Sequence, residues 1–195
     1  MHPRDFLDSY WRPGTRDSAF IAMPFHSEFS PIWIEALRPA IEQDLRPALK
    51  AERVDASILS GSIIMDILDG IAHSKVVVAD ISVAQEGRWK GQRNGNVMYE
   101  VGLAHASRQS TEVLLLRSDS EDINFDLAGI RVHSYDRSDF AASRERFARL
   151  VADTLAQIDH TKGLQVQKAV DALDADALEF IKSCGQSPGF YGPEP

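Results

Sequence analysis

The chain has 195 residues, of which 44% are hydrophobic and 26% are charged, a balance typical of a soluble globular protein with a buried core. Its 29 acidic and 21 basic side chains leave a net charge of -8, which argues against a basic face that binds nucleic acid. No apolar stretch approaches the roughly 18 residues of a membrane span, and the start lacks the apolar segment of a secretory signal. The single cysteine fits a reducing compartment, so we expect a cytoplasmic protein that does not enter membranes.

Apolar runs and helical spacings alternate along the chain from residue 19 onward. Short apolar runs predict strands, and apolar residues that recur every three or four positions predict helices. In chain order the predicted elements are a strand at 19–25, a helix at 32–45, a strand at 53–57, a helix at 63–71, a strand at 75–80, a helix at 96–107, strands at 112–116 and 130–135, and a helix at 140–158. Residues 1–18 show no period, and we interpret them as a leader on the surface.

This alternation predicts an α/β domain over residues 19–158, built on a doubly wound five-stranded parallel sheet. The valine-rich run at 75–80 lacks polar alternation, as expected of a strand covered on both faces. In such sheets ligands bind beyond the carboxyl ends of the strands. A response-regulator site would need several acids after the first strand, where the sequence has Ala22-Met-Pro-Phe25. The sequence has no Gly-x-Gly-x-x-Gly phosphate loop, so we expect no dinucleotide redox chemistry and no cofactor.

Residues 159–195 form a third part with a different pattern. Apolar residues recur there at alternating steps of four and three, at Val166, Val170, Leu173, Ala177 and Phe180. The spacing predicts one added C-terminal helix that stops near Gly185. Two heptads are too few for an independent coiled coil, so this apolar stripe must dock either on its own domain or on a second copy in a homodimer.

Two carboxylates stand at the expected binding edge of the sheet. Asp80 ends the strand at 75–80, and Glu100 lies near the start of the next helix. If Asn96 is the N-cap, Glu100 falls in the first helical turn, at the border of the face that packs on the sheet. Each carboxylate also has a purely structural interpretation. An acid in the first turn opposes the helix dipole, and an aspartate after a strand often caps a turn.

The neighbouring residues also have structural interpretations. Asn96 is a typical helix cap, Tyr99 a typical packing residue, and Gly102 would permit close approach of the helix to the sheet. Histidines occur in several predicted elements, but without the spacing of metal ligands, so we expect no metal site.

Four segments together resemble the TIR-like and nucleoside 2-deoxyribosyltransferase-like nucleotide-binding families, over residues 19–135. They are Phe20-Ile-Ala-Met-Pro-Phe25, Val76-Val-Val-Ala-Asp-Ile-Ser82, Asn94-Gly-Asn-Val-Met-Tyr-Glu-Val-Gly-Leu-Ala-His-Ala106 and Phe125-Asp-Leu127. The resemblance implies a flavodoxin-like or TIR-like sheet and a nucleotide or nucleoside ligand, with NAD as a candidate substrate. A long insertion at 85–93, which contains Trp89 and two arginines, departs from the pattern of these families.

The resemblance also implies roles for individual residues. Glu100 would be the catalytic carboxylate, and Asp80 would hold the sugar hydroxyls. The remaining substrate-binding residues would be Met23, Pro24, Phe25, Ser82, Asn96, Tyr99, Phe125 and Asp126.

This assignment agrees with the chemistry of N-glycosidic bonds. Positive charge develops on the sugar as the base leaves, so a carboxylate facing the anomeric carbon can stabilise that state or attack it. A second carboxylate on the hydroxyls would orient the sugar. A helix dipole would keep Glu100 ionised, whereas burial would raise its pKa, and either effect can dominate.

Three functions therefore stay open. The first is cleavage or transfer at an N-glycosidic bond of NAD or of a nucleoside or nucleotide. The second is a signalling module that binds a nucleotide without turning it over. The third is self-assembly through the C-terminal helix with a vestigial pocket.

Overall fold

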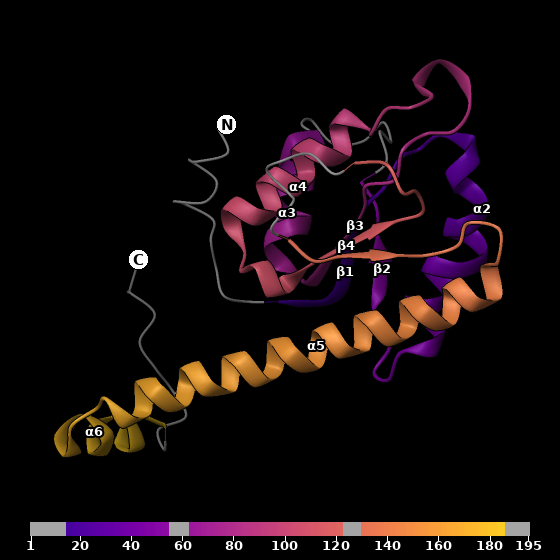
Figure 1. Cartoon of the computed structure of the whole chain (residues 1–195). Helices are drawn as coiled ribbons and strands as arrows, with labels where there is room; N and C mark the ends of the chain where they lie inside the picture. Colours follow the sequence, from indigo (N-terminus) through magenta and orange to yellow (C-terminus); the bar gives the residue numbers. More distant parts are fainter. Residues whose placement is uncertain (1–14, 55–62, 123–129, 186–195) are drawn as a thin grey trace. The chain divides into compact units, whose positions relative to one another are not determined.

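The computed structural model describes residues 15–54, 63–122 and 130–185. Its centre is a sheet of five parallel strands in the order β2-β1-β3-β4-β5 (Figure 1). The strands are β1 (Arg16–Ala22), β2 (Lys50–Glu52), β3 (Ser74–Asp80), β4 (Val113–Arg117) and β5 (Val132–Ser134). This flavodoxin-like order confirms the predicted doubly wound α/β sheet.

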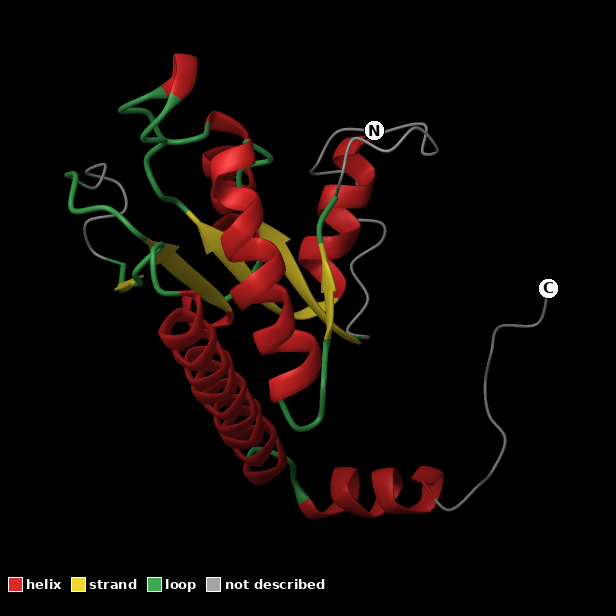
Figure 2. Ribbon diagram, turned by 90° about the vertical axis from the view of Figure 1, so that its right-hand side faces the viewer, coloured by secondary structure: helices red, strands yellow, loops and turns green. Residues whose placement is uncertain are grey.

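The helical segments alternate with these strands along the chain (Figure 2). They are η1 (Ser27–Phe29), α2 (Ser30–Ile32), η2 (Trp33–Leu37), η3 (Ala40–Asp44), α3 (Ile63–His73), η4 (Gly87–Trp89), α4 (Gly95–Ser107), η5 (Ser110–Glu112), α5 (Phe140–Asp171) and α6 (Ala175–Gly185). The helix predicted at 32–45 therefore consists of α2 followed by two wider π-type segments.

The first strand begins earlier than predicted. β1 starts at Arg16, inside the segment interpreted as a leader, and Arg16 pairs with Ser74 of β3. The first two residues of this strand are exposed, which explains why the apolar run begins only near Ala19. The second strand, β2, ends at Glu52, just before the predicted strand at 53–57, of which residues 55–57 lie outside the described residues. The start of β1 is held by backbone pairing, and such pairing leaves no trace in the pattern of apolar residues.

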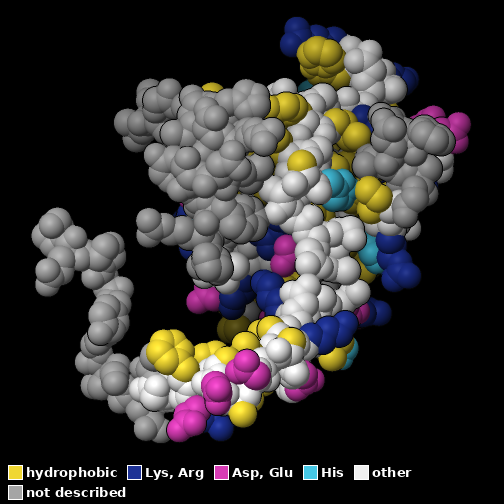
Figure 3. All heavy atoms as spheres, turned by 90° about the vertical axis from the view of Figure 1, so that its left-hand side faces the viewer, with side chains coloured by type: hydrophobic (Ala, Val, Ile, Leu, Met, Phe, Trp, Pro, Cys, Tyr) yellow, Lys and Arg dark blue, Asp and Glu magenta, His cyan; other side chains and the backbone are white. Residues whose placement is uncertain are grey.

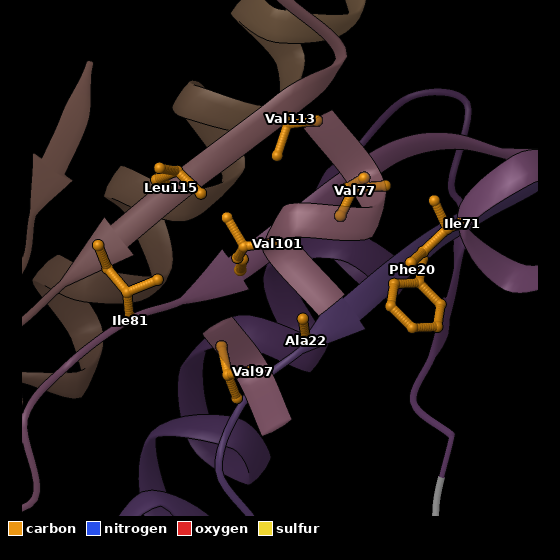
Figure 4. Packing of buried hydrophobic residues seen from close by; sticks show 11 residues of the cluster. Phe20, Ala22, Ile71, Val77, Ile81, Val97, Val101, Val113 and Leu115 are labelled. Carbon is orange, nitrogen blue, oxygen red and sulfur yellow. The ribbon is translucent and has the colours of Figure 1, made fainter. Parts of the chain in front are cut away.

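One half of the core lies between the sheet and the helices α3 and α4 (Figure 4). Phe20 and Val77 of the sheet pack there with Ile71 of α3 and Val101 of α4. Consecutive residues of β3 from Val76 onward are buried, so the central strand is covered on both faces, as its valine-rich sequence predicts.

Glycines at the two helices behave differently. A Cβ atom added at Gly70 of α3 would lie 2.5 Å from Cδ2 of the buried Phe20 ring, so a glycine is required for α3 to approach β1 this closely. A Cβ at Gly102 of α4 would meet nothing within 4 Å. The expectation that Gly102 permits close helix-to-sheet approach is therefore wrong, because Gly102 lies on the exposed side of α4.

The chain divides into two compact units, Met1–Ala156 and Gln157–Pro195. The C-terminal region ends its last helix at Gly185, as predicted, but it holds two helical segments where one added helix was expected. α5 continues through Ile158 to Asp171, and α6 starts anew at Ala175. The break occurs because Asp174 caps α6, where its Oδ1 accepts a hydrogen bond of 2.8 Å from the backbone N–H of Ala177.

Hydrophobic side chains lie at the surface of these C-terminal helices (Figure 3). Their exposed members are Leu164, Val166, Val170, Phe180 and Ile181. No helix among the described residues combines the length and the apolar character that crossing a membrane requires.

Candidate functional site

Two pockets adjoin each other at the carboxyl ends of β1 and β3. The segments that follow these strands line both pockets, and Val54 and the start of α3 also line one of them. The larger, which we call the Glu100 pocket, has a volume of about 710 Å³ and is lined mainly by apolar residues, with Met23, Phe25, Val97 and Glu100 among them. The smaller, which we call the Ser82 pocket, has a volume of about 500 Å³ and a more polar lining. The two pockets share four lining residues, namely His26, Trp89, Asn94 and Asn96.

The position of Glu100 within α4 differs from the predicted one. Asn94, rather than Asn96, is the N-cap, and its Oδ1 accepts hydrogen bonds of 3.0 and 3.2 Å from the backbone N–H groups of Asn96 and Val97. Glu100 therefore lies in the second turn, where the helix dipole has largely lost its effect. Stabilisation of the helix start does not explain this acid.

Burial dominates the electrostatics of Glu100. The side chain is half-buried in its pocket, and desolvation raises the pKa of its carboxyl to about 7, although the positive charge of Arg53 opposes the shift. A carboxyl that titrates near neutral pH inside a pocket is typical of acids with a chemical role.

Arg53 is held in place by two aromatic rings and the backbone. Its guanidinium lies 4.2 Å from the centre of the Phe25 ring and 4.9 Å from that of Trp33. It also donates a hydrogen bond of 3.4 Å to the carbonyl oxygen of Pro24. A fixed positive charge therefore acts on Glu100, and sequence analysis missed it because Arg53 comes from the β2 end of the sheet, far from Glu100 in the chain.

Asp80 does not share the pocket of Glu100. Its side chain is buried, and its Oδ1 accepts hydrogen bonds from the backbone N–H of Ser82 at 3.0 Å and from the Ser82 hydroxyl at 2.5 Å. Its Oδ2 accepts a bond of 2.6 Å from the hydroxyl of Tyr135. Burial raises the pKa of Asp80, and these hydrogen bonds oppose the shift. Within the described residues Asp80 lines neither of these two pockets, because it is buried and bonded to Ser82 and Tyr135. The structure therefore gives no support to the expectation that Asp80 holds the sugar hydroxyls.

The Asp80 carboxylate instead centres a buried network that joins the ends of three strands. The Ser82 hydroxyl accepts a bond of 2.8 Å from the backbone N–H of Ser118, which follows β4. Arg137 donates to the Ser118 hydroxyl at 2.7 Å. The network connects the segments after β3, β4 and β5, and through Ser82 it reaches the lining of the Ser82 pocket. Tyr135 and Arg137 carry no motif that would have revealed this role.

The other predicted site residues are distributed over both pockets. Met23, Phe25 and Tyr99 line the Glu100 pocket, and Pro24 lines the Ser82 pocket. Asn96 borders both. Ser82 lines the pocket named after it, but its side chain is buried and engaged with Asp80, which limits its contact with a ligand. The predicted residues Phe125 and Asp126 lie outside the described residues.

Three residues that border both pockets were not among the predicted site residues, namely His26, Trp89 and Asn94. Nδ1 of His26 accepts a bond of 3.4 Å from the backbone N–H of Glu28, which places the proton of a neutral ring on Nε2. The sequence did give one indication that Trp89 has a binding role. Trp89 lies in a polar insertion, where an aromatic side chain has no hydrophobic core to pack into.

The described residues contain no candidate metal-binding site. No three His, Cys, Asp or Glu side chains come together there in a way that could hold a metal ion.

Comparison with known proteins does not assign a family. No family model matches the chain, and no curated protein matches it. One similar solved structure is the metal-soaked Flv1 flavodiiron core from Synechocystis sp. PCC6803, with 12% sequence identity and a TM-score of 0.49. The match covers 81% of this chain and 40% of that chain. The fold is shown by the strand order itself.

Proposed function

We propose that this protein cleaves or transfers at the N-glycosidic bond of a nucleoside or nucleotide, with NAD among the candidate substrates. The observation that carries the proposal is Glu100. It is a half-buried carboxyl in a pocket of about 710 Å³ beyond the strand ends, and its pKa is raised to about 7. The sequence resemblance from residue 19 to 135 supports the same role for this residue.

The chemistry requires the ionised form of Glu100. When the bond between the anomeric carbon and the base breaks, the base leaves with the electron pair and the sugar becomes positively charged. The carboxylate stabilises this state or bonds to the anomeric carbon, and water or a second base then completes hydrolysis or transfer. The apolar lining lowers the local polarity around the carboxylate and so strengthens its attraction to a positively charged sugar.

Base release tests the proposal directly. The purified protein is incubated with NAD, 2'-deoxynucleosides and nucleoside 5'-monophosphates, and the free base is measured by chromatography. We expect release by the wild type with at least one substrate, and a loss of at least about a hundredfold in Glu100→Gln, because the amide carries no negative charge. Release should also rise with pH through about 7, as Glu100 ionises.

The matched control is Glu145→Gln, which removes the same charge from an exposed residue of α5 that pairs with Arg149 at the surface. This variant should keep full activity. A wild type inert toward all three substrate classes, or a Glu100→Gln variant as active as the wild type, would refute the proposal.

A second candidate function is binding of a nucleotide without turnover. The observation that favours it is the burial of Asp80, which leaves Glu100 as the one acid among the described lining residues of the two pockets. Such a site lacks a second carboxylate to orient the sugar. A thermal shift with a nucleotide in the absence of base release would distinguish this function from catalysis.

A further inference from the structure

The insertion between β3 and α4 is an ordered hairpin. An antiparallel bridge pairs Val83 with Arg93, and the backbone N–H of Ala84 donates to the carbonyl of Gln92 at 3.0 Å. The backbone N–H of Gly91 donates back to the carbonyl of Ala84 at 2.8 Å. The hairpin projects beyond the carboxyl ends of the strands, with η4 at its tip (Figure 2).

Side chains fix this hairpin at its base. Arg93 is nearly buried, donates to the backbone carbonyl of Ile81 and forms an ion pair of 3.3 Å with Asp119. The backbone N–H of Gln85 donates to the Glu28 carboxylate at 3.1 Å. The hairpin is therefore attached both to the end of β3 and to the segment that follows β1.

The tip of the hairpin rests against the pocket wall. Gly87 has a φ of 69°, and a Cβ there would lie 3.3 Å from Nε2 of His26, which borders both pockets. A side chain at this position would be strained and would press on the histidine ring. The glycine thus lets the tip approach the site closely.

The hairpin carries Trp89 to the boundary between the two pockets. Trp89 is 50% exposed. A tryptophan with this exposure contributes little to the stability of a fold. The Arg88 guanidinium lies 4.5 Å from the ring centre, which restrains its orientation. Phe25 and Tyr99 border the Glu100 pocket alone, whereas Trp89 borders both pockets.

We propose that Trp89 determines substrate specificity by stacking its indole on the planar base of the nucleoside or nucleotide. This inference rests on the proposed function, since a sugar held with its anomeric carbon at Glu100 carries its base into the surrounding pocket, and Trp89 lines that same pocket. Stacking on an aromatic ring depends on the area of the base, so the site should favour purines over pyrimidines.

Binding measurements separate stacking from other contributions. All variants carry Glu100→Gln so that no substrate is consumed, and dissociation constants are measured by titration calorimetry for AMP, CMP and ribose 5-phosphate. Trp89→Ala should weaken AMP binding by at least about fivefold, and CMP binding by less. Ribose 5-phosphate has no base, so its affinity should not change. Trp89→Phe should restore most of the AMP affinity, and Phe180→Ala, which removes an exposed aromatic residue of α6, should have no effect.

Two results would overturn the stacking role. One is an AMP affinity that is the same with and without Trp89, and the other is an equal loss for ribose 5-phosphate, which would indicate that the hairpin itself had changed. The outcome is independent of catalysis. An inert wild type whose AMP binding still depends on Trp89 refutes the glycosidic activity alone, whereas an active wild type whose KM is unchanged in Trp89→Ala refutes the stacking role alone.

Discussion

Two carboxylic acids near the carboxyl end of β3, Asp80 and Glu100, differ in their surroundings and therefore in what each can do. Asp80 ends β3 and Glu100 lies in α4, the next long helix, but the oxygens of Asp80 accept three hydrogen bonds inside the protein. Glu100 instead lines a pocket and is desolvated by apolar neighbours. A satisfied buried carboxylate stabilises structure, whereas a desolvated one at a pocket wall is available to a ligand.

The raised pKa of Glu100 predicts a pH-dependent cost in stability. A carboxyl with a pKa of about 7 in the folded state, against an ordinary value of 4.5, binds its proton more tightly when folded. Folding is therefore favoured below about pH 4.5, and this advantage is lost as the pH rises to about 7. Relative to the wild type, Glu100→Gln should gain about 1 to 3 kcal/mol in free energy of unfolding between about pH 5 and pH 8, allowing for partial exposure.

Urea denaturation of both proteins at the two pH values measures this difference, and Glu145→Gln serves again as the control for loss of one charge. A difference between Glu100→Gln and the wild type that does not change with pH would show that the carboxyl is not desolvated.

At the scale of elements, close packing of α3 on β1 depends on one glycine. Gly70→Ala should lower the free energy of unfolding by about 1 to 3 kcal/mol, because the added Cβ meets the Phe20 ring, which is buried and cannot move aside. Gly102→Ala is the matched control in α4, where the added Cβ meets nothing within 4 Å. It should instead raise the stability by up to about 1 kcal/mol, since alanine favours helices.

Thermal or urea unfolding compares these two glycine variants with the wild type. If Gly70→Ala raises the stability as Gly102→Ala is expected to do, helix propensity rather than contact with Phe20 controls the effect at Gly70.

At the scale of the whole molecule, the second unit has large apolar side chains that are exposed to solvent. Phe180 is 68% exposed and Val166 is 64% exposed. We expect these side chains to pack on a second copy of the chain, because burial of such area is favourable. In light scattering, the wild type should then exceed the chain mass of 21.7 kDa, and Phe180→Asp should return it to that mass.

The control for this prediction is Glu179→Gln, an exposed substitution beside Phe180 that should leave the mass unchanged. A wild type that already has the mass of one chain would exclude self-association. Docking of the stripe within one chain would then be indicated if Phe180→Asp lowered the melting temperature.

Sequence analysis predicted the order of strands and helices because burial leaves a direct record in the chain. The valine-rich β3 had to be covered on both faces, and the alternation of strands and helices allowed few connections. The candidate acid Glu100 was also identifiable, through a motif on α4. Element ends were harder to predict, since the cap at Asn94 and the start of α6 at Asp174 each depend on one or two local hydrogen bonds.

Only the tertiary structure decided which side chains meet. Tyr135 and Ser82 lie 53 positions apart, yet both bond to Asp80 inside the protein. The positive charge of Arg53, which follows β2, acts on Glu100 of α4. The sequence by itself determined the fold class, because periodicity is a local property of the chain. Desolvation and hydrogen bonding of a carboxyl depend on neighbours brought together by folding, so they were settled in three dimensions.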